Sequence, residues 1–237
     1  MNIKDDFILS QINEGYLVGG SVRDFLLGKS YYDRDIAIKG AKEFAEQISK
    51  QFDGTLITLD EENQIFRVVL PDKLNYFDIS EIVGCSIEDD LKRRDFTINS
   101  IAYDLKEGRF IDITGGLEDL KNGILRHYRD SNFEDDPLRI LRAFRFLAIT
   151  GFEPSEELKT AIIKYKHLLL KPSVERISYE LMKLFGGQHA SKILLLADEY
   201  EILERLCPFV KEMKQVPPNS HHHLDLFHHV VETVRNI

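Results

Sequence analysis

The amino-acid pattern of this chain changes character near residue 130. Up to about residue 128, short β-rich runs alternate with helical ones, whereas beyond residue 134 only helical patterns are expected. The expected strands are 16–18, 35–38, 55–59, 66–70, 76–80 and 110–113, and the expected helices are 22–27 and 41–52. We therefore predict an α+β fold, in which a head with a mixed β-sheet and flanking helices precedes an all-helical neck.

The second part of the chain contains periodic apolar patterns separated by glycine and proline. Helices are expected at 136–150, 155–169, 173–185 and 190–206, with breaks at Gly151, Pro172 and Gly186-Gly187. Pro217-Pro218 then precedes a last helical stretch, 221–237. This organisation predicts three parts: a head at 1–128, a helical neck or body at 129–216, and the incomplete start of a further helical domain at 217–237.

Composition limits the compartment and the class of partner. The two cysteines make a disulfide framework unexpected, no apolar run approaches the length of a membrane span, and the first residues lack a signal-peptide pattern. A cytoplasmic location is therefore predicted. The net charge of −9 argues against a purely electrostatic nucleic-acid binder, although Lys92-Arg93-Arg94 could still contact phosphates locally.

A Gly-Gly turn follows the first expected strand, in Gly19-Gly20-Ser21-Val22-Arg23-Asp24. Glycines between a strand and a helix let backbone amides approach a phosphate, and the helix N-terminus attracts negative charge. Arg23 could add a charge-assisted hydrogen bond. On its own the motif is weak, because a Gly-Gly pair before a helix is more often a plain turn than a phosphate site.

Acidic residues occur at alternating positions in Asp33-Arg34-Asp35 and again at Asp78. On a strand, Asp33 and Asp35 would lie on the same face. Close carboxylates repel unless a cation neutralises them, which suits Mg²⁺. An exposed strand edge with solvated charge is the alternative for an isolated D-x-D. With Asp78 as a third catalytic acid, the pattern indicates two-metal phosphoryl transfer.

Two further charged segments follow. Residues 89–102 (DDLKRRDFTINSIA) read as a charged helix before a buried segment, for which solvated charge is the simplest explanation. Residues 135–146 (DDPLRILRAFRF) open with acids and a proline suited to a helix N-terminus. Arg139, Arg142 and Arg145 then recur every three residues. Arginines beside apolar residues indicate an anionic or planar partner.

These four segments, in this order, resemble the class II tRNA nucleotidyltransferase and bacterial poly(A) polymerase family of the DNA polymerase β superfamily. The resemblance extends over nearly the whole chain, and RRDFTINSIA is its most specific part. It implies a template-independent enzyme that uses Mg²⁺ to add nucleotides from CTP or ATP to the 3′ end of tRNA and releases pyrophosphate. Poly(A) addition is the alternative within the family, because the core motifs barely distinguish the two.

The resemblance also implies roles for individual residues. Asp33 and Asp35 would bind the catalytic metals. Asp136 and Arg139 would hydrogen-bond the base edge as a protein template, and Arg142 would make a further nucleotide contact. The remaining nucleotide contacts implied are Gly19, Gly20, Arg23, Arg94, Asp95 and Asn99.

The family pattern is not matched at every position. Asp135 stands where the family usually has Glu, which puts the role of that residue in doubt. Glu175 and Arg176 belong to a motif that braces the neck, and we interpret both as structural. His221–His223 and the histidines that follow could open an HD-type phosphohydrolase domain, but its later His-Asp pair is absent from this chain. An inactive nucleotide- or RNA-binding module is disfavoured because the acids and arginines are present.

A shortened loop concerns the choice of nucleotide. In family members that complete CCA, a flexible loop lies between the strand of the third acid and the RRD motif. Here only 14 residues, 79–92, separate Asp78 from Arg93, and 79–87 is short and apolar, with a tight turn expected at 83–86. The shortened segment resembles the branch that adds CC and leaves the final A to another enzyme. A lineage that shortened the loop and still adds A is the alternative.

Overall fold

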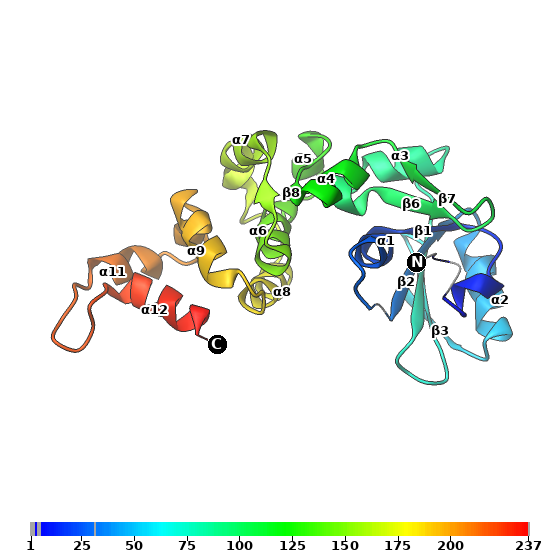
Figure 1. Ribbon diagram of the computed structural model, residues 1–237, viewed down its shortest axis with the longest axis horizontal. Helices are drawn as coiled ribbons and strands as arrows, with labels where there is room; N and C mark the ends of the chain where they lie inside the picture. Colours follow the sequence, from blue (N-terminus) through cyan, green and yellow to red (C-terminus); the bar gives the residue numbers. More distant parts are fainter. Residues whose placement is uncertain (1–2, 4–5, 31, 237) are drawn as a thin grey trace. The chain divides into compact units, whose positions relative to one another are not determined.

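A computed structural model describes residues 3, 6–30 and 32–236 and divides the chain into two compact units, 1–121 and 122–237. The first unit is built on a seven-stranded sheet in the order β3-β4-β5-β2-β1-β6-β7 (Figure 1). Its strands are β1 Tyr16–Val18, β2 Asp33–Ile38, β3 Thr55–Asp60, β4 Ile65–Val69, β5 Tyr76–Glu81, β6 Ile101–Asp104 and β7 Arg109–Asp112. Among the described strands of this sheet, only β2 and β5 pair in parallel and the other neighbours are antiparallel, so the predicted mixed sheet is confirmed.

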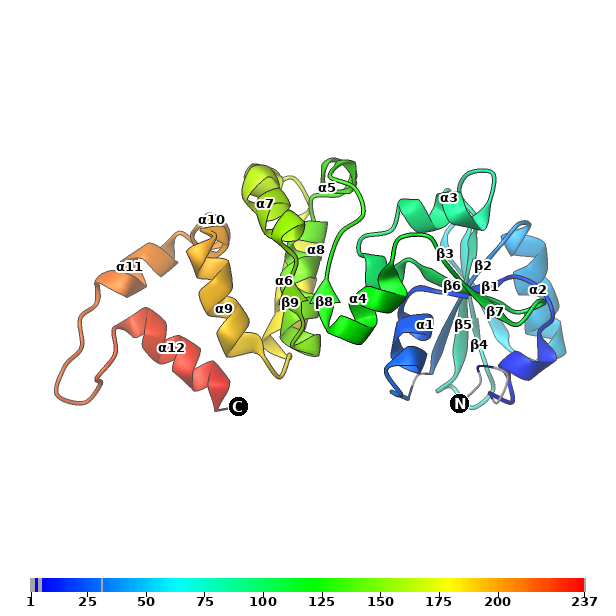
Figure 2. The same ribbon diagram turned by 45° about the horizontal axis from the view of Figure 1, so that its top comes forward.

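Helices lie around this sheet (Figure 2), and two hydrophobic clusters assign them to its two faces. On one face, α1 (Gly19–Leu26) packs against β1, β2 and β6, and α2 (Ala41–Gln51) packs against β2–β5. That face carries the main core, in which Leu17, Ile36 and Phe77 are fully buried. On the other face, the short α3 (Ile87–Lys92) packs over Val18 and Ala102. The strands β2 and β5 therefore keep part of one face accessible.

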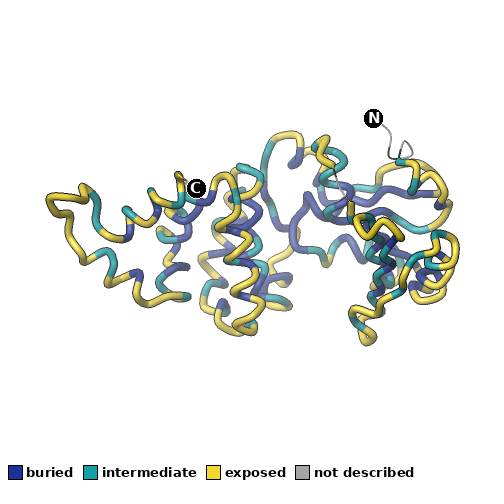
Figure 3. The backbone as a smooth tube through the Cα atoms, turned by 90° about the horizontal axis from the view of Figure 1, so that it is seen from below, coloured by how far each residue is buried: buried dark blue, intermediate teal, exposed yellow. Residues whose placement is uncertain are grey.

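The second unit is helical. Its main helices are α5 Ser131–Asp135, α6 Arg139–Thr150, α7 Glu156–Tyr165, α8 Val174–Phe185, α9 Ala190–Glu199, α10 Ile202–Leu206, α11 Phe209–Gln215 and α12 Leu226–Arg235. α6 lies at the centre, with residues 143–148 all buried, and packs against α8 and α9 (Figure 3). The segment between α8 and α9 can approach α6 closely because residue 187 is glycine. An added Cβ at Gly187 would lie 2.6 Å from the backbone of Ala148 in α6.

Several sequence predictions differ from the structure in detail. The strand β6 was not expected, because its four residues are all buried and show no alternation. The expectation that no strand follows residue 134 is wrong, because Glu153–Pro154 (β9) pairs with Ile124–Leu125 (β8). The helix expected at 190–206 is two helices, because Glu201 adopts a left-handed φ of 59°. The last helix begins at Leu226, where the Asp225 side chain caps it, and Ile237 lies outside the described residues.

The remaining segments connect these elements. Residues 116–122 form α4 (Gly116–Asn122) at the end of the first unit, and one turn of 3-10 helix, η3 (Thr97–Asn99), leads into β6. None of the helices in the described ranges is long and apolar enough to cross a membrane.

Candidate active site

Three acidic side chains lie on the accessible face of the sheet. Asp33 and Asp35 alternate with buried residues in β2, as their spacing predicts. Asp78 lies directly beside Asp35, because β2 and β5 pair in parallel with these two residues in register. All three are half-buried. Arg34, between the two acids, faces the other way and forms a buried ion pair of 2.8 Å with Asp6.

The two glycines, which the structure places in the first turn of α1 and not before the helix, lie against Asp35. Gly19 has a φ of 64°, and a Cβ there would lie 3.2 Å from Nη1 of Arg94 and 3.3 Å from Oδ2 of Asp35. The absence of a side chain at Gly19 therefore lets the backbone, Arg94 and Asp35 approach one another. At Gly20 a Cβ would lie 3.5 Å from Nη2 of Arg23 and 3.6 Å from the same Asp35 oxygen.

The surroundings of Asp35 disfavour its negative charge. Burial raises the pKa of this carboxyl to about 6, with Asp33 and Asp78 adding to the effect, while Arg94 and the Ser21 hydroxyl oppose it. The Ser21 hydroxyl donates to Asp35 Oδ2 over 3.3 Å and also accepts from the Asp35 backbone N–H at 2.8 Å. The acid pair is thus a site of unbalanced negative charge that a cation would relieve.

The arginine at the end of α3 is held by an acid in the same helix. Arg94 donates from Nε and Nη2 to one oxygen of the buried Asp90, and Arg93 donates to the other. Burial opposes the ionisation of Asp90, but the two arginines outweigh it and hold the pKa of that carboxyl below its usual range. Sequence reasoning missed Asp90, although acid-to-arginine spacings of three and four are a recognisable helical pattern.

A second chain of hydrogen bonds starts at Arg23 in α1. Its Nε and Nη2 donate to the carboxylate of Asp24, and its Nη1 donates to the Asn99 side chain at 2.8 Å. Asn99 in turn donates to Asp95 at 3.0 Å, and Asp95 accepts from the backbone N–H of Phe96. Asp95 and Asn99 are both buried. The Arg23 guanidinium is therefore held by Asn99, which Asp95 in turn fixes in place.

Arg67 in β4 is a further neighbour of the acids that sequence reasoning missed. Its Nε and Nη2 donate to the two oxygens of Asp78, each at 2.7 Å, and its guanidinium lies 4.3 Å from the centre of the Tyr76 ring. Asp78 was predicted to be the third catalytic acid. The structure places it beside Asp35 and shows both its oxygens occupied by Arg67.

The acid pair has the donors that Mg²⁺ requires. Within the described ranges, no three His, Cys, Asp or Glu side chains are close enough together to enclose a metal ion. Mg²⁺ is commonly held by only one or two carboxylates together with substrate phosphates, so it does not need such an enclosure. Asp33 and Asp35 supply two oxygen donors on one accessible face, and the raised pKa of Asp35 marks the charge that a cation would balance.

The second unit contains the residues predicted to select the base. Asp136 precedes α6, where one carboxylate oxygen accepts from Arg176 at 2.9 Å and the other from the Leu138 N–H at 3.2 Å. Arg139, at the start of α6, donates to the Asn132 carbonyl at 3.2 Å. A carboxylate has about four acceptor positions, so Asp136 can still accept from a base amine.

The other two arginines of α6 contact Glu180 of α8. Arg145 is buried and its Nη1 lies 3.0 Å from a carboxylate oxygen of the buried Glu180, whereas Nη1 of the half-exposed Arg142 lies 3.8 Å from the other oxygen. The Phe146 ring lies 4.5 Å from the guanidinium of Arg145. Arg145 thus meets anionic and planar partners inside its own unit, where it connects α6 to α8.

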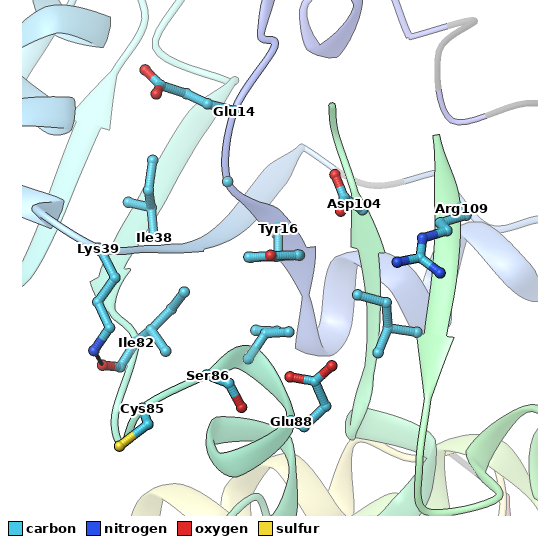
Figure 4. A pocket seen from close by; sticks show the side chains of 13 residues that line it. Glu14, Tyr16, Ile38, Lys39, Ile82, Cys85, Ser86, Glu88, Asp104 and Arg109 are labelled. Carbon is cyan, nitrogen blue, oxygen red and sulfur yellow. Dashed lines mark hydrogen bonds between the residues drawn. The ribbon is translucent and has the colours of Figure 1, made fainter. Parts of the chain in front are cut away.

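A cavity of about 460 Å³ opens elsewhere on the first unit. It lies between β1, β6, β7 and the segment leading into α3, with Tyr16, Glu88 and Arg109 around it (Figure 4). None of the three acids lines it. The cavity is therefore separate from the acid pair, and the accessible face beside Asp33 and Asp35 remains the candidate active site.

Comparison with protein families gives two matches along the chain. The model described as poly A polymerase head domain matches residues 15–126, and the model described as "Probable RNA and SrmB-binding site of polymerase A" matches residues 151–214.

Curated relatives differ in their printed activities. The chain is 38% identical to a CCA-adding enzyme of Ligilactobacillus salivarius over 88% of this chain and 60% of that one. It is 37% identical to a CC-adding tRNA nucleotidyltransferase of Synechocystis over 79% and 45%, and 34% identical to an A-adding tRNA nucleotidyltransferase of Deinococcus radiodurans over 93% and 51%. The chain thus spans about half the length of these relatives.

Solved structures match at a similar level. The Thermotoga maritima CCA-adding enzyme complexed with tRNA-CCA has a TM-score of 0.76 and 30% identity, over 96% of this chain and 59% of that chain. Both units of the present fold therefore have counterparts in a solved enzyme.

Proposed function

This chain belongs to the family of class II tRNA nucleotidyltransferases and bacterial poly(A) polymerases, and we propose on that basis that it adds nucleotides to the 3′ end of tRNA without a nucleic-acid template. One observation carries the proposal. Asp33 and Asp35 share one face of the sheet, and Asp35 lies beside Arg94 and beside Gly19, whose φ of 64° disfavours a side chain.

The proposed reaction is a phosphoryl transfer. The terminal 3′ hydroxyl of the RNA attacks the α-phosphorus of the incoming triphosphate, loses its proton, and the bond to the β-phosphate breaks to release pyrophosphate. Asp33 and Asp35 would hold Mg²⁺, which when bound lowers the pKa of the attacking hydroxyl and balances the charge of the leaving group. Arg94 and Arg23, beside the glycines, would bind the triphosphate.

Base choice would fall to the second unit. Asp136 and Arg139 offer an acceptor and a donor at the start of α6, which together match the edge of cytosine or adenine. Arg176 supports this role because its ion pair orients the Asp136 carboxylate. We propose Asp136 and Arg139 as the protein template and Arg142 as an adjoining nucleotide contact.

CTP is the proposed first substrate, and CC the proposed product. The segment between β5 and α3 is only residues 82–86. It is anchored at both ends: Lys39 donates to the carbonyls of Ile82 and Gly84, and Asp89 and Asp90 accept from backbone N–H groups within it. A short, anchored segment of this kind supports the proposal, because the change from CTP to ATP is associated with a flexible loop in this position.

The test uses the full-length protein with tRNA that lacks its CCA end and with an unrelated RNA. Incorporation of labelled CTP into tRNA alone supports the proposal. Addition of several adenylate residues in succession to either RNA indicates the poly(A) polymerase alternative. Sequencing the products made with CTP and ATP together decides the finer point. Ends that stop at CC are expected, and efficient formation of CCA refutes the CC-only proposal while leaving tRNA nucleotidyl transfer intact.

A further inference from the structure

Arg67 is held rigidly on two sides, yet one end of its guanidinium has no partner among the described residues. The Asp78 carboxylate fixes Nε and Nη2, and the Tyr76 ring lies under the planar group at 4.3 Å. Nη1 takes part in neither contact. About a third of the side chain, 34%, is exposed to solvent. A guanidinium fixed in this way loses little conformational freedom when it donates to an anion.

The position of Arg67 relative to the acids limits which anion it can meet. Neighbouring strands place Arg67, Asp78 and Asp35 in one row across β4, β5 and β2. Gly19 and Gly20 at the start of α1 lie against Asp35 from the side of β1, on the opposite side of that row. Arg94, which follows α3, lies against Gly19 and thus on the same side. The acid pair therefore has a cationic group on each side along the strand order.

Transfer chemistry distinguishes the two sides. The attacking and leaving oxygens lie roughly in line with the phosphorus between them. If the leaving pyrophosphate occupies the side of Gly19, Gly20 and Arg94, the attacking hydroxyl must approach from the side of Asp78. The first anionic group attached to that hydroxyl's nucleotide is its own 5′ phosphate, the last phosphodiester of the RNA.

We propose that Arg67 binds the last phosphodiester of the RNA through Nη1 and positions the 3′ hydroxyl toward Asp33 and Asp35, with Tyr76 supporting the guanidinium. This inference rests on the proposed function and assigns the RNA side of the same site. Asp78 then acts as the residue that orients Arg67, which accounts for its two hydrogen bonds to that side chain.

The test pairs a change in the protein with a change in the RNA. The full-length protein and an Arg67→Gln variant are compared for binding to tRNA lacking its CCA end and to the same tRNA with its last phosphodiester replaced by a neutral methylphosphonate. For each protein, the ratio of its dissociation constants for the two tRNAs is the measured quantity. RNA contacts made elsewhere affect both constants equally and cancel in this ratio. The wild type should prefer the phosphodiester by about tenfold, the value of one charge-assisted hydrogen bond, and Arg67→Gln by less than about twofold.

Controls separate binding from a structural effect. Arg109→Gln removes a charge from the opposite edge of the same sheet and should keep the full tenfold preference. The KM for CTP should change by less than about twofold in Arg67→Gln. If Arg67→Gln does not fold, Arg67→Lys takes its place. Lysine keeps the positive charge but lacks the planar, forked set of donors of a guanidinium. The preference of Arg67→Lys for the phosphodiester should fall to about threefold or less.

The failures can be told apart. Full retention of the preference in Arg67→Gln or Arg67→Lys refutes the inference, even if turnover falls, because Arg67 would then only orient Asp78. A wild-type protein that transfers no nucleotide to any RNA refutes the proposed function, and the inference with it.

Discussion

The hydroxyl of Ser21, in α1, accepts a 2.8 Å hydrogen bond from the backbone N–H of Asp35, in β2, and lies 3.3 Å from one oxygen of the Asp35 carboxylate. The carbonyl oxygen of Asp33 lies 3.1 Å away, so this carbonyl and the Asp35 carboxylate share the single hydroxyl proton. This single buried hydroxyl joins the Gly-Gly motif to the D-x-D motif, so the geometry of the acid pair depends on the helix that follows the glycine turn.

Ser21→Ala should therefore weaken both stability and activity. The Asp35 N–H loses its buried acceptor, which costs about 1–3 kcal/mol of unfolding free energy. The rate of nucleotide addition should fall by about tenfold, because Asp35 is no longer held in place. Urea unfolding and single-turnover kinetics measure the two effects. Ser10→Ala is the matched control, since that hydroxyl is exposed and bonds only to the Phe7 carbonyl, and equal losses in both variants would contradict the expectation.

Asp35→Asn should abolish most activity without unfolding the protein. Loss of a metal ligand should lower the rate at saturating Mg²⁺ by at least ~100-fold. In the wild type, Mg²⁺ should raise the thermal midpoint, whereas in Asp35→Asn it should have little effect. Asp53→Asn, at an exposed turn that tolerates asparagine, should behave as wild type. Near-full activity of Asp35→Asn would remove this residue from the metal site.

The same variant should change how stability depends on pH when a chelator removes metal. The folded pKa of Asp35, about 6, lies above its value in the unfolded chain, so folding favours the protonated form. The contribution of this carboxyl to the free energy of unfolding is complete below about pH 4 and is lost as the pH rises through about 6. Asp35→Asn should thus be more stable than wild type at pH 7, by up to ~2 kcal/mol, and equal to it near pH 4. Parallel curves from pH 4 to 7 would contradict this assignment.

Arg23 and Arg139 should fail in different ways. Arg23, held by Asp24 and Asn99 beside the glycine turn, is placed to bind the triphosphate of any nucleotide. Arg23→Ala should therefore lower kcat/KM for CTP, ATP, UTP and GTP alike. Arg139→Ala should instead reduce the discrimination among them, because it removes a donor to the base edge. Uniform losses in both variants would show that Arg139 contacts phosphate only.

Glu180→Gln tests the ion pair between α6 and α8. Glu180 is 3% exposed, so its replacement leaves the charge of Arg145 buried beside a neutral group, which should cost about 3–5 kcal/mol. Glu156→Gln is the matched control, because its ion pair with Lys159 is exposed and should be worth less than ~1 kcal/mol. Urea unfolding measures both. A loss below about 1 kcal/mol for Glu180→Gln would mean that packing alone holds these helices together.

Local sequence patterns determined the elements that carry the site. Alternation in β2 placed Asp33 and Asp35 on one face, and the Gly-Gly turn marked the start of α1. These features depend on the side-chain period of a strand and on the conformational freedom of glycine, which act over a few residues. The same local reasoning missed β6, because a strand buried at every position has no alternation to read.

Only the tertiary structure decided which strands lie side by side. β5 inserts between β4 and β2, and this order puts Asp78 next to Asp35 and Arg67 next to Asp78. Arg67 and Asp35 are 32 positions apart in the sequence, and no local pattern links them. Strand order is chosen by the burial of the whole sheet face, in which Ile36, Phe77 and Val68 pack together, so the partners of the acids follow from the core and not from their own motifs.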